Sequence, residues 1–411
     1  MQKFDIKEDG NHGKPVWNFS PGPCILPRAV LDKCAEEMID YRGCGRSVME
    51  LAHRSPEFES IDLMTKAEIK QFLEVPDTHV VMLQQGGATM QYTGIVKNLI
   101  GLRPARKAMF MTTGTWSQQC ITEARKFIPE DKLIEVTNLA STDFRTMTDP
   151  STWKIDAEAS YIHICMNETV HGIEIANNPN FPWHMIPKDV VVVGDCSSNL
   201  GSFHIDWNRM DVIYAGAQKN MGPSGTTIII VRRDLLGHQE PDCPVLSDWT
   251  QNELNRGPQG HSQPTGGFLP GYYNTPPTYS IYVLGLNTAY MNQRGGIDTY
   301  IREAKAKSAM LWDLCDHSDG YYCIKMAPAW RSRMNCVFRI GDPVKGTPAL
   351  EKKLQAEALK DKITNINGHV TNPGIRISSY NAMPITGVQH LCAFLTKFKA
   401  ENPIPSASAK M

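Results

Sequence analysis

The sequence predicts an α/β protein whose core is a mostly parallel β-sheet. Residues 90–235 alternate between short apolar runs and polar stretches compatible with helices, and the runs include YIHICM, VVVVGD, DVIYAGA and TTIIIVR. Strands that are apolar along their whole length are typical of a sheet buried on both faces. Because helical stretches separate these runs, we expect parallel strands joined by helices. The 411 residues allow this core and a second, smaller domain.

The C-terminal third of the chain predicts a small α+β domain. Proline and glycine gather in residues 240–277, which we interpret as a long ordered loop, and residues 278–318 are predicted to be helical apart from a glycine pair. The apolar run NCVFRI, a charged helix-like stretch at 349–362 and the run PGIRISSYN follow. We therefore divide the chain into a large domain (30–297), a small domain (1–29 and 298–403) and a disordered tail (404–411).

The composition favours small-molecule chemistry in a reducing compartment. The 42 basic and 43 acidic side chains nearly cancel, so neither a nucleic acid nor an acidic membrane surface is expected as a partner. The N-terminus is polar and acidic, and the longest apolar runs are too short to span a bilayer. The eleven cysteines form no Cys-x-x-Cys pair and have no zinc-ligand spacing with histidine, which argues against a metal site and a disulfide framework. We expect a cytoplasmic protein.

The strongest chemical signal is Lys219, in the turn after the run DVIYAGA. A lysine at a strand end beside a crevice is partly desolvated, which lowers its pKa and makes its amine nucleophilic toward an aldehyde. Asp195 ends the run VVVVGD, at the edge where open α/β sheets bind ligands. This pair suits pyridoxal phosphate (PLP), because the acid pairs with the pyridine nitrogen and the lysine forms a Schiff base. The alternatives are a solvated surface lysine and a helix-capping aspartate.

Three further features fit the same cofactor. Gly86 and Gly87 follow the apolar run VVML and precede a predicted helix, whose first amides would bind a phosphate group. Trp116 is a candidate for stacking on the pyridine ring, and Thr169 is a candidate for a hydrogen bond to the ring hydroxyl. Each has an ordinary alternative, because glycine pairs also make turns and a tryptophan is more often packed in a core.

Taken together, the motifs resemble a known family. DVIYAGAQKNMGPSGTTII is similar to the lysine signature of the class V aminotransferases, which are PLP-dependent enzymes of fold type I. Segments in order from residue 18 to residue 384 resemble the phosphoserine aminotransferases in particular: NFSPGP, SVMELAHRSPEF, MNETVHGI, YAGAQKNMGPSG, YNTPPT, RSRMN and ISSYNAMP. The resemblance implies a seven-stranded, mainly parallel sheet in the large, cofactor-binding domain, covered by the small α+β domain.

The resemblance also implies roles for residues of the cofactor site. Lys219 would be the catalytic residue that carries PLP, and Asp195 would meet the pyridine nitrogen. Trp116 would stack on the ring, and Thr169 would bind its hydroxyl. The cofactor phosphate would be held by polar groups of two chains: Gln218 and the backbone of Ala88 and Thr89, with Asn274 and Thr275 of a neighbouring subunit. A homodimer with shared active sites follows.

Substrate binding is implied for four cationic or titratable side chains: His53, Arg54, His369 and Arg376. The family has an arginine directly after the histidine of its GH motif, but this chain has Val370. Residues 247–272, before YNTPPT, also form a longer segment than in compact members of the family. We expect another cation to compensate for the missing arginine. The candidates are Arg256, above all, and His261, Arg46, Arg331 and Arg333.

The implied reaction moves the amino group of L-glutamate to 3-phosphohydroxypyruvate, which gives O-phospho-L-serine and 2-oxoglutarate, a step of serine biosynthesis. One alternative is another class V PLP enzyme with a relaxed preference for phosphate, such as a serine–glyoxylate-type aminotransferase. A cysteine desulfurase is disfavoured because Cys336 lies in an apolar run and not in a mobile loop. A non-catalytic nucleotide-binding α/β protein is disfavoured because no G-x-G-x-x-G motif follows an early strand.

Overall fold

The centre of the molecule is a seven-stranded β-sheet with the strand order β2-β10-β9-β8-β5-β3-β4. The structure is a computed structural model that describes residues 16–176, 178–254 and 272–404. The strands are β2 (His79–Gln84), β3 (Lys107–Thr112), β4 (Leu133–Asn138), β5 (Ala159–Cys165), β8 (Val191–Asp195), β9 (Val212–Gly216) and β10 (Thr227–Arg232). All are parallel except β10, which pairs antiparallel with both β2 and β9. The predicted mainly parallel α/β sheet is confirmed.

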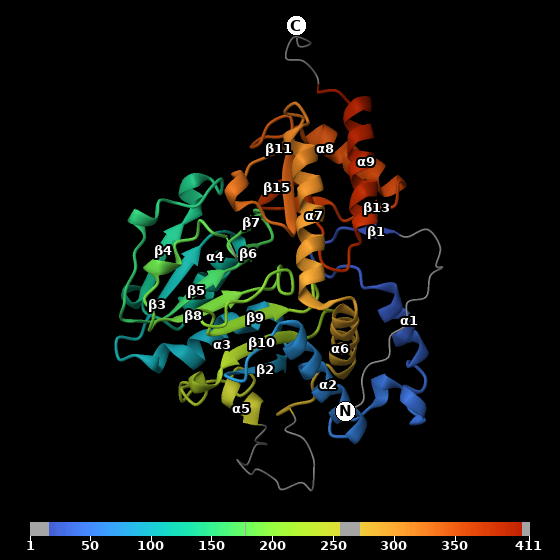
Figure 1. Cartoon of the computed structure of the whole chain (residues 1–411). Coiled ribbons are helices and arrows are strands. Elements are labelled where there is room, and N and C mark those ends of the chain that lie inside the picture. The colour runs from blue at the N-terminus through green and yellow to red at the C-terminus, as the bar shows by residue number, and fades with distance from the viewer. Residues whose placement is uncertain (1–15, 177, 255–271, 405–411) are drawn as a thin grey trace.

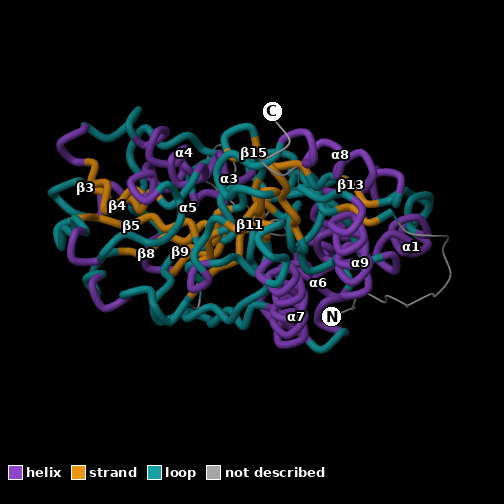
Figure 2. Tube along the Cα trace, turned by 90° about the horizontal axis from the view of Figure 1, so that it is seen from above, coloured by secondary structure: helices purple, strands orange, loops and turns teal. Residues whose placement is uncertain are grey.

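Helices bury both faces of this sheet. In β9, Ile213 and Ala215 belong to one core cluster, and Val212 and Tyr214 belong to the cluster on the opposite face. Helices α2 (Pro56–Phe72) and α6 (Thr278–Gln293) pack on the first face, and α3 (Gly87–Leu99) and α4 (Thr115–Ala124) pack on the second. Figure 2 shows the strands running through the middle of the molecule between helices. Two buried faces explain why these strands are continuously apolar.

A smaller antiparallel sheet of four strands lies above the large sheet in Figure 1. Its order is β11-β12-β15-β14, with the bounds β11 (Tyr322–Ile324), β12 (Asn335–Ile340), β14 (Asn367–His369) and β15 (Asn372–Ser378). Helices α8 (Pro348–Lys360) and α9 (Ile385–Glu401) cover it, and β1 (Trp17–Asn18) pairs in parallel with β13 (Ile363–Thr364) beside it. Helix α1 (Arg28–Glu36) follows β1 and packs against α6.

Helix α7 (Gly296–Asp316) connects the two cores (Figure 1). Ile297 and Tyr300, near its start, pack in the core of the large sheet, while Leu311 and Cys315, near its end, pack under the small sheet. Helices α6 and α7 meet at the predicted glycine pair, so the helical prediction for residues 278–318 is confirmed. The domain boundaries stay predictions.

The predicted loop at residues 240–277 is wrong in one part, because Trp249–Leu254 form helix α5. One local and one tertiary feature explain the helix. The Asp248 carboxylate accepts a hydrogen bond from the Gln251 amide at 3.1 Å, and the Trp249 side chain is buried in the core. Residues 255–271 lie outside the described ranges.

Other sequence expectations concern bonds and membranes. All eleven cysteines are free in the structure. Within the described ranges, no helix has the length and apolar character needed to cross a bilayer. In the same ranges, no group of three or more His, Cys, Asp or Glu side chains is placed to hold a metal ion.

Candidate active site

Lys219 lies in the turn that joins β9 to β10 and is partly buried. Its Nζ donates a hydrogen bond to Thr169 Oγ1 at 2.8 Å and lies 5.4 Å from the centroid of the Trp116 ring. Gly22 (φ +121°) passes close beside it, since a β-carbon there would lie 3.0 Å from Lys219 Cγ. Burial lowers the pKa of the Lys219 ammonium. The sequence interpretation of a solvated surface lysine does not fit this environment.

Asp195 ends strand β8, next to the strand that leads to Lys219. Its side chain is only 4% exposed, and its Oδ1 accepts a hydrogen bond from the Ser197 amide at 2.9 Å. Burial raises the pKa of the Asp195 carboxyl, and the nearby Lys219 charge partly opposes this rise. A cationic group bound beside Asp195 would favour the carboxylate form, as a protonated pyridine nitrogen does.

Trp116 and Thr169 reach Lys219 from the ends of two other parallel strands. Trp116 is in the first turn of α4, after β3, and Thr169 follows β5 on a hairpin made of β6 (Asn167–Glu168) and β7 (Ile173–Glu174). The fully buried Glu168 holds the two segments together, because its carboxylate accepts the Trp116 amide at 3.1 Å and the Ser117 amide at 2.9 Å. The candidate site thus lies at the carboxyl edge of the parallel strands.

The start of α3 offers a phosphate site on the same edge. Gly86 adopts φ +87° as the N-cap residue and provides no side-chain cap. The amides of the first turn, which include Ala88 and Thr89, have no acceptor within the helix. Gln218, the neighbour of Lys219, folds its side-chain amide over Gly216. An aromatic face, a buried carboxylate, a lysine amine and free helix amides are the groups that PLP requires.

The small sheet contributes a buried cation to this site. Arg376, on β15, is 7% exposed, and its Nε has no hydrogen-bond partner within the described residues. Its charge acts to lower the pKa of both Lys219 and His369, after burial, which is the larger cause for each. His369 Nδ1 lies 2.8 Å from Thr371 Oγ1, which is 3.5 Å from Thr115 Oγ1 beside Trp116. A buried guanidinium without an acceptor is costly, so this arrangement suits an anionic ligand.

The structure does not bring every predicted residue to Lys219. His53 and Arg54 lie just before α2, where the Ser55 side chain caps the helix, and the contacts described around Lys219 within this chain do not include them. His53 Nε2 is buried without a partner in the described part of the chain, and burial lowers the pKa of this histidine. Arg54 is exposed.

Asn274 and Thr275 lie beside the start of α3 of their own chain. Asn274 Nδ2 donates to Gln85 Oε1 at 3.3 Å, and Gln85 Nε2 donates to the Thr275 carbonyl at 3.1 Å. With Gly86 and Met90, Asn274 lines a cavity of about 220 Å³. Their predicted contact with the cofactor of a neighbouring subunit stays a prediction.

The expected replacements for the arginine missing at Val370 are mostly engaged elsewhere. Arg46 pairs with Glu57 at 2.7 Å, Arg331 with Asp316 at 2.6 Å and Arg333 with Glu174 at 2.7 Å. Each of these three guanidinium groups has a carboxylate partner in this chain, and the expectation that one of them fills the gap stays a prediction. Arg256 and His261 lie outside the described residues. Val370 itself is 94% exposed.

Sequence reasoning missed His171, which follows Thr169 by two residues in MNETVHGI. Its Nε2 lies 3.2 Å from Thr115 Oγ1, and its ring stacks on Phe144 with centroids 3.9 Å apart. Burial lowers the pKa of His171 to about 4, with smaller effects of the Lys325 and His369 charges. The signal was present, since Thr169 was already a candidate and the hairpin turn places both side chains near α4.

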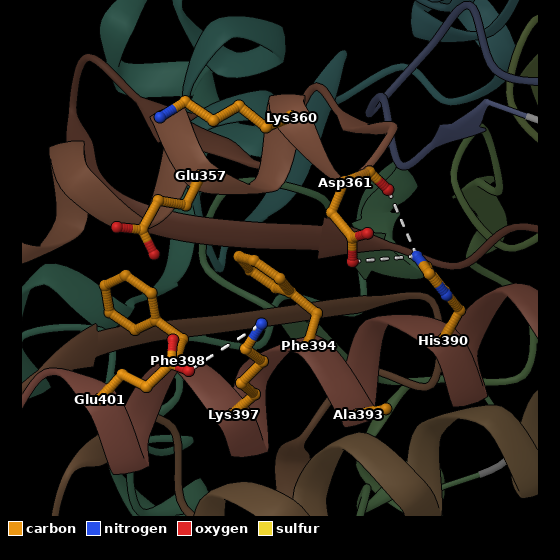
Figure 3. Close-up of a pocket in the computed structure, with 9 residues that line it drawn as sticks. All are labelled: Glu357, Lys360, Asp361, His390, Ala393, Phe394, Lys397, Phe398 and Glu401. Carbon is orange, nitrogen blue, oxygen red and sulfur yellow. Dashed lines mark hydrogen bonds and ion pairs between the residues drawn. The ribbon is translucent and has the colours of Figure 1, made fainter.

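A separate pocket of about 470 Å³ lies between α8 and α9 (Figure 3). Its charged side chains pair with one another: His390 Nε2 lies 3.2 Å from Asp361 Oδ2, and Lys397 Nζ lies 3.9 Å from Glu401 Oε1. None of the residues around Lys219 lines this pocket. We therefore do not include it in the candidate active site.

Comparison with known proteins agrees with this geometry. The model of the family "Aminotransferase class-V" matches residues 16–391. The phosphoserine aminotransferase of Herminiimonas arsenicoxydans is 39% identical, over 94% of this chain and 99% of its own length. A solved, PLP-bound phosphoserine aminotransferase of Trichomonas vaginalis has a TM-score of 0.82 at 29% identity and covers 93% of this chain and 100% of its own. The chain therefore belongs to the class V aminotransferase family and, within it, to the phosphoserine aminotransferases.

Proposed function

We propose that the protein is a PLP-dependent transaminase that exchanges an amino group between L-glutamate and 3-phosphohydroxypyruvate, with O-phospho-L-serine and 2-oxoglutarate as the other pair. The observation that carries the proposal is the position of Lys219 Nζ. It donates a hydrogen bond to Thr169 Oγ1 and lies over the Trp116 ring. The charges of the buried Asp195 and Arg376 both act on its pKa. Relatives named phosphoserine aminotransferase or probable phosphoserine aminotransferase, which match 94% of this chain, support the same activity.

Each residue of the site has a chemical task in this proposal. PLP, when bound, supplies an electron sink for the bonds at the substrate Cα. Asp195 would hold the protonated pyridine nitrogen, and Trp116 would orient the ring. Lys219 Nζ would act as the base that removes the Cα proton of the amino acid, and burial, which lowers its pKa, favours the free amine that this task needs. Thr169 Oγ1 fixes the position of the amine.

Substrate recognition is assigned to the cations around the site. Arg376 would bind the substrate carboxylate, because its guanidinium is buried and lacks an acceptor for Nε among the described residues. His369 lies close enough to Arg376 for the arginine charge to act on its pKa. His53 and Arg54 would complete the phosphate site from a second subunit.

We also propose a cytoplasmic homodimer with shared sites. Large apolar side chains are exposed on α1, on α2 and between them: Leu31, Ile39, Met49 and Leu63. His53 and Arg54 lie in the same stretch of chain. An exposed apolar surface of this kind is typical of a contact between subunits. The near-neutral charge balance and the free cysteines support the compartment.

The test of the proposed function is a panel of keto acids offered with L-glutamate as donor. We expect 3-phosphohydroxypyruvate to be converted with a kcat/KM at least a hundredfold above those of glyoxylate, pyruvate and hydroxypyruvate. Val370 favours one alternative, a serine–glyoxylate-type enzyme with a relaxed need for phosphate, since a ligand for the dianion is missing there. Equal or better turnover of glyoxylate with serine as donor would support that alternative and contradict our proposal.

A further inference from the structure

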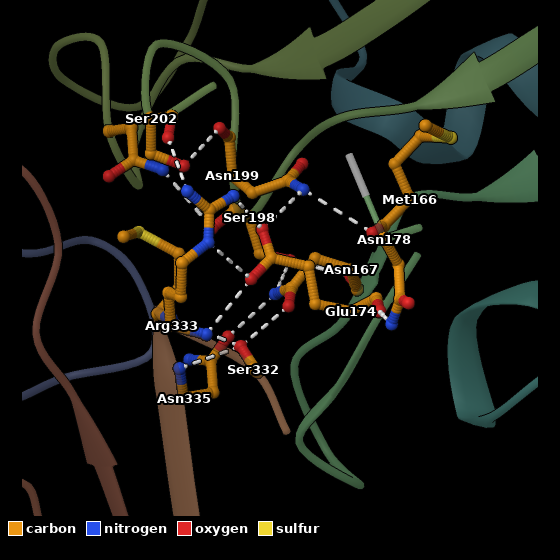
Figure 4. Close-up of polar contacts among 12 residues, drawn as sticks. Met166, Asn167, Glu174, Asn178, Ser198, Asn199, Ser202, Ser332, Arg333 and Asn335 are labelled. Carbon is orange, nitrogen blue, oxygen red and sulfur yellow. Dashed lines mark hydrogen bonds and ion pairs between the residues drawn. The ribbon is translucent and has the colours of Figure 1, made fainter. Parts of the chain in front are cut away.

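The hairpin β6–β7, residues 167–174, is attached to the small sheet by buried polar contacts (Figure 4). This hairpin carries two groups of the active site, Thr169 and Glu168. Its turn is joined to residues 331–335 through the backbone, since the Ser332 amide donates to the Gly172 carbonyl at 2.9 Å and Ile173 forms a bridge with Arg331. The lysine contact of Thr169 therefore depends on a segment of the small sheet.

An ion pair between the buried Glu174 and the partly buried Arg333 strengthens this attachment. The Glu174 carboxylate accepts Arg333 Nη2 at 2.7 Å, Arg333 Nε at 3.0 Å and the Arg333 amide at 2.9 Å. Asn199 Nδ2 adds a fourth donor at 3.2 Å, and Arg333 Nη1 donates to the Ser202 carbonyl at 2.9 Å. Every partner therefore comes either from the hairpin, from the loop after Asp195, or from the start of β12 (Figure 4).

A chain of side-chain hydrogen bonds continues from the hairpin to Ser378, on the strand β15 that carries Arg376. Asn167 Nδ2 donates to Asn335 Oδ1 at 2.8 Å, and Asn167 Oδ1 accepts from Ser332 Oγ at 2.6 Å. Asn335 Nδ2 in turn donates to Ser378 Oγ at 2.9 Å, on the strand that carries Arg376. These side chains are all buried, so their geometry is fixed on both sides.

We propose that Glu174, Arg333 and the Asn167–Asn335 pair are positioning residues that set the distance between Lys219 and Arg376. Because Thr169 holds the lysine amine and Ser378 lies two residues from Arg376, a shift of this linkage moves the carboxylate-binding arginine relative to the reacting carbon. Misplacement of about 1 Å lowers transamination strongly even when all catalytic groups are present. The inference rests on the proposed function of the site.

The chain contains a matched control for the ion pair. Arg339, further along β12, pairs with Glu351 of α8 through Nε at 2.8 Å and Nη2 at 3.1 Å, and both side chains are buried. This second pair lies within the small sheet and its helix and does not touch the hairpin. Glu174→Gln and Glu351→Gln therefore remove the same charge from the same kind of pair, but only the first affects the linkage.

The experiment compares the two variants as holoenzymes. We expect both to lower the midpoint of thermal unfolding, but only Glu174→Gln to raise the KM for glutamate at least tenfold and to weaken binding of glutarate, measured by calorimetry, by a similar factor. Glutarate has both carboxylates of glutamate and no amino group, so its binding reports the position of Arg376 without turnover. For Glu351→Gln we expect both constants to stay within twofold of the wild type.

Two results would overturn the inference. One is a Glu174→Gln enzyme that loses thermal stability but keeps both constants within twofold, and the other is an equal rise in both variants. If Glu174→Gln does not fold, Asn335→Ala, which keeps the ion pair, takes its place with the same expected tenfold effects. A wild type that binds glutarate but does not transaminate would contradict the proposed function. The glutarate affinities of the wild type and the variants could still be compared in that case, because binding needs no turnover.

Discussion

At the scale of single residues, burial shifts the pKa values of Asp195 and Lys219 more than their charged or hydrogen-bonded neighbours do. Desolvation disfavours the charged form of each group, since burial raises the pKa of the Asp195 carboxyl and lowers that of the Lys219 ammonium. A cation bound beside Asp195 would lower the pKa of its carboxyl again and favour the carboxylate form.

Replacing Asp195 tests this account of the acid. We expect Asp195→Asn to keep the fold but to lower kcat by at least about a hundredfold, because a neutral pyridine is a poor electron sink. The control is Asp211→Asn, which removes a partly buried carboxylate just before β9, at the end of the strand away from Lys219. Asp211 Oδ2 accepts a hydrogen bond from the Val192 amide at 2.7 Å. Steady-state kinetics of the two variants would contradict the role of Asp195 if they showed equal losses.

The missing arginine at Val370 leads to a second prediction at this scale. A charged hydrogen bond to a phosphate contributes about 1.5–3 kcal/mol, so its loss without compensation weakens binding by about ten- to a hundredfold or more. Arg46, Arg331 and Arg333 are paired with acids, which leaves Arg256 as the main candidate. We expect Arg256→Ala to raise the KM for phosphoserine about tenfold and that for glutamate much less.

The control for Arg256 is Arg302→Ala, which removes an exposed arginine on α7 that contacts only Thr299 in the described hydrogen bonds. Small and equal effects of Arg256→Ala on both substrates would exclude Arg256 from the phosphate site. In that case, a Val370→Arg variant with sharply better phosphoserine turnover would indicate that the enzyme has relaxed its phosphate preference.

At the scale of secondary structure, the sequence allowed the elements to be predicted where the pattern was local. The apolar runs became β5, β8, β9 and β10, because a strand buried on two faces is apolar at most of its positions. The break between α6 and α7 followed from the glycine pair. Helix α5 was missed because its stability comes from the buried Trp249, which depends on tertiary contacts.

The candidate site, too, could be predicted only where a local sequence pattern marked its residues. Strand ends point to Lys219 and Asp195, because the carboxyl edge of a parallel sheet is fixed by the order of strands and helices. The roles of Glu168, Glu174 and Arg333 were not predictable, since their contacts join segments up to 159 residues apart. No local pattern marks such a pair.

Helix α7 carries a buried lysine that gives a prediction for this element. Lys307 is fully buried, and its Nζ donates to the carbonyls of Tyr380 at 2.7 Å and Met383 at 2.9 Å. Burial lowers the pKa of Lys307 to about 8, while an unfolded lysine titrates near 10.4. Below pH 8 both states are protonated and the burial cost is complete. Between about pH 8 and 10.4 the folded state loses its proton first, so its stability rises with pH.

We therefore expect the wild type to gain about 2 kcal/mol in the free energy of unfolding, relative to a Lys307→Met variant, between pH 7.5 and pH 9.5. Urea unfolding at both pH values measures this difference, and the comparison removes the contribution of other titrating groups. Parallel pH dependences of the two proteins would show that the pKa of Lys307 is not lowered in the folded state, and would contradict this prediction.

At the scale of the whole molecule, the active site depends on more than one packed unit. The large sheet supplies Lys219 and Asp195, and the small sheet supplies Arg376 and His369. The proposed homodimer adds Asn274 and Thr275 from a second chain. Subunit mixing tests this last part: a Lys219→Ala chain and an Asn274→Ala, Thr275→Ala chain, each inactive alone, should regain activity in heterodimers.

Restored activity is expected because one of the two sites in each heterodimer would contain an intact lysine and an intact pair from the partner. Subunit exchange is monitored separately with differently tagged chains, so that a lack of mixing is not mistaken for a lack of complementation. Confirmed exchange without any recovery of activity would contradict the shared site.

Borohydride reduction of the purified protein tests most directly whether Lys219 binds the cofactor covalently. We expect visible absorbance that disappears on reduction, with one added cofactor mass on the tryptic peptide that contains Lys219. Lys307 is the natural comparison, because its pKa is also lowered by burial. A label on Lys307 or another lysine, or no visible absorbance after incubation with PLP, would contradict the account.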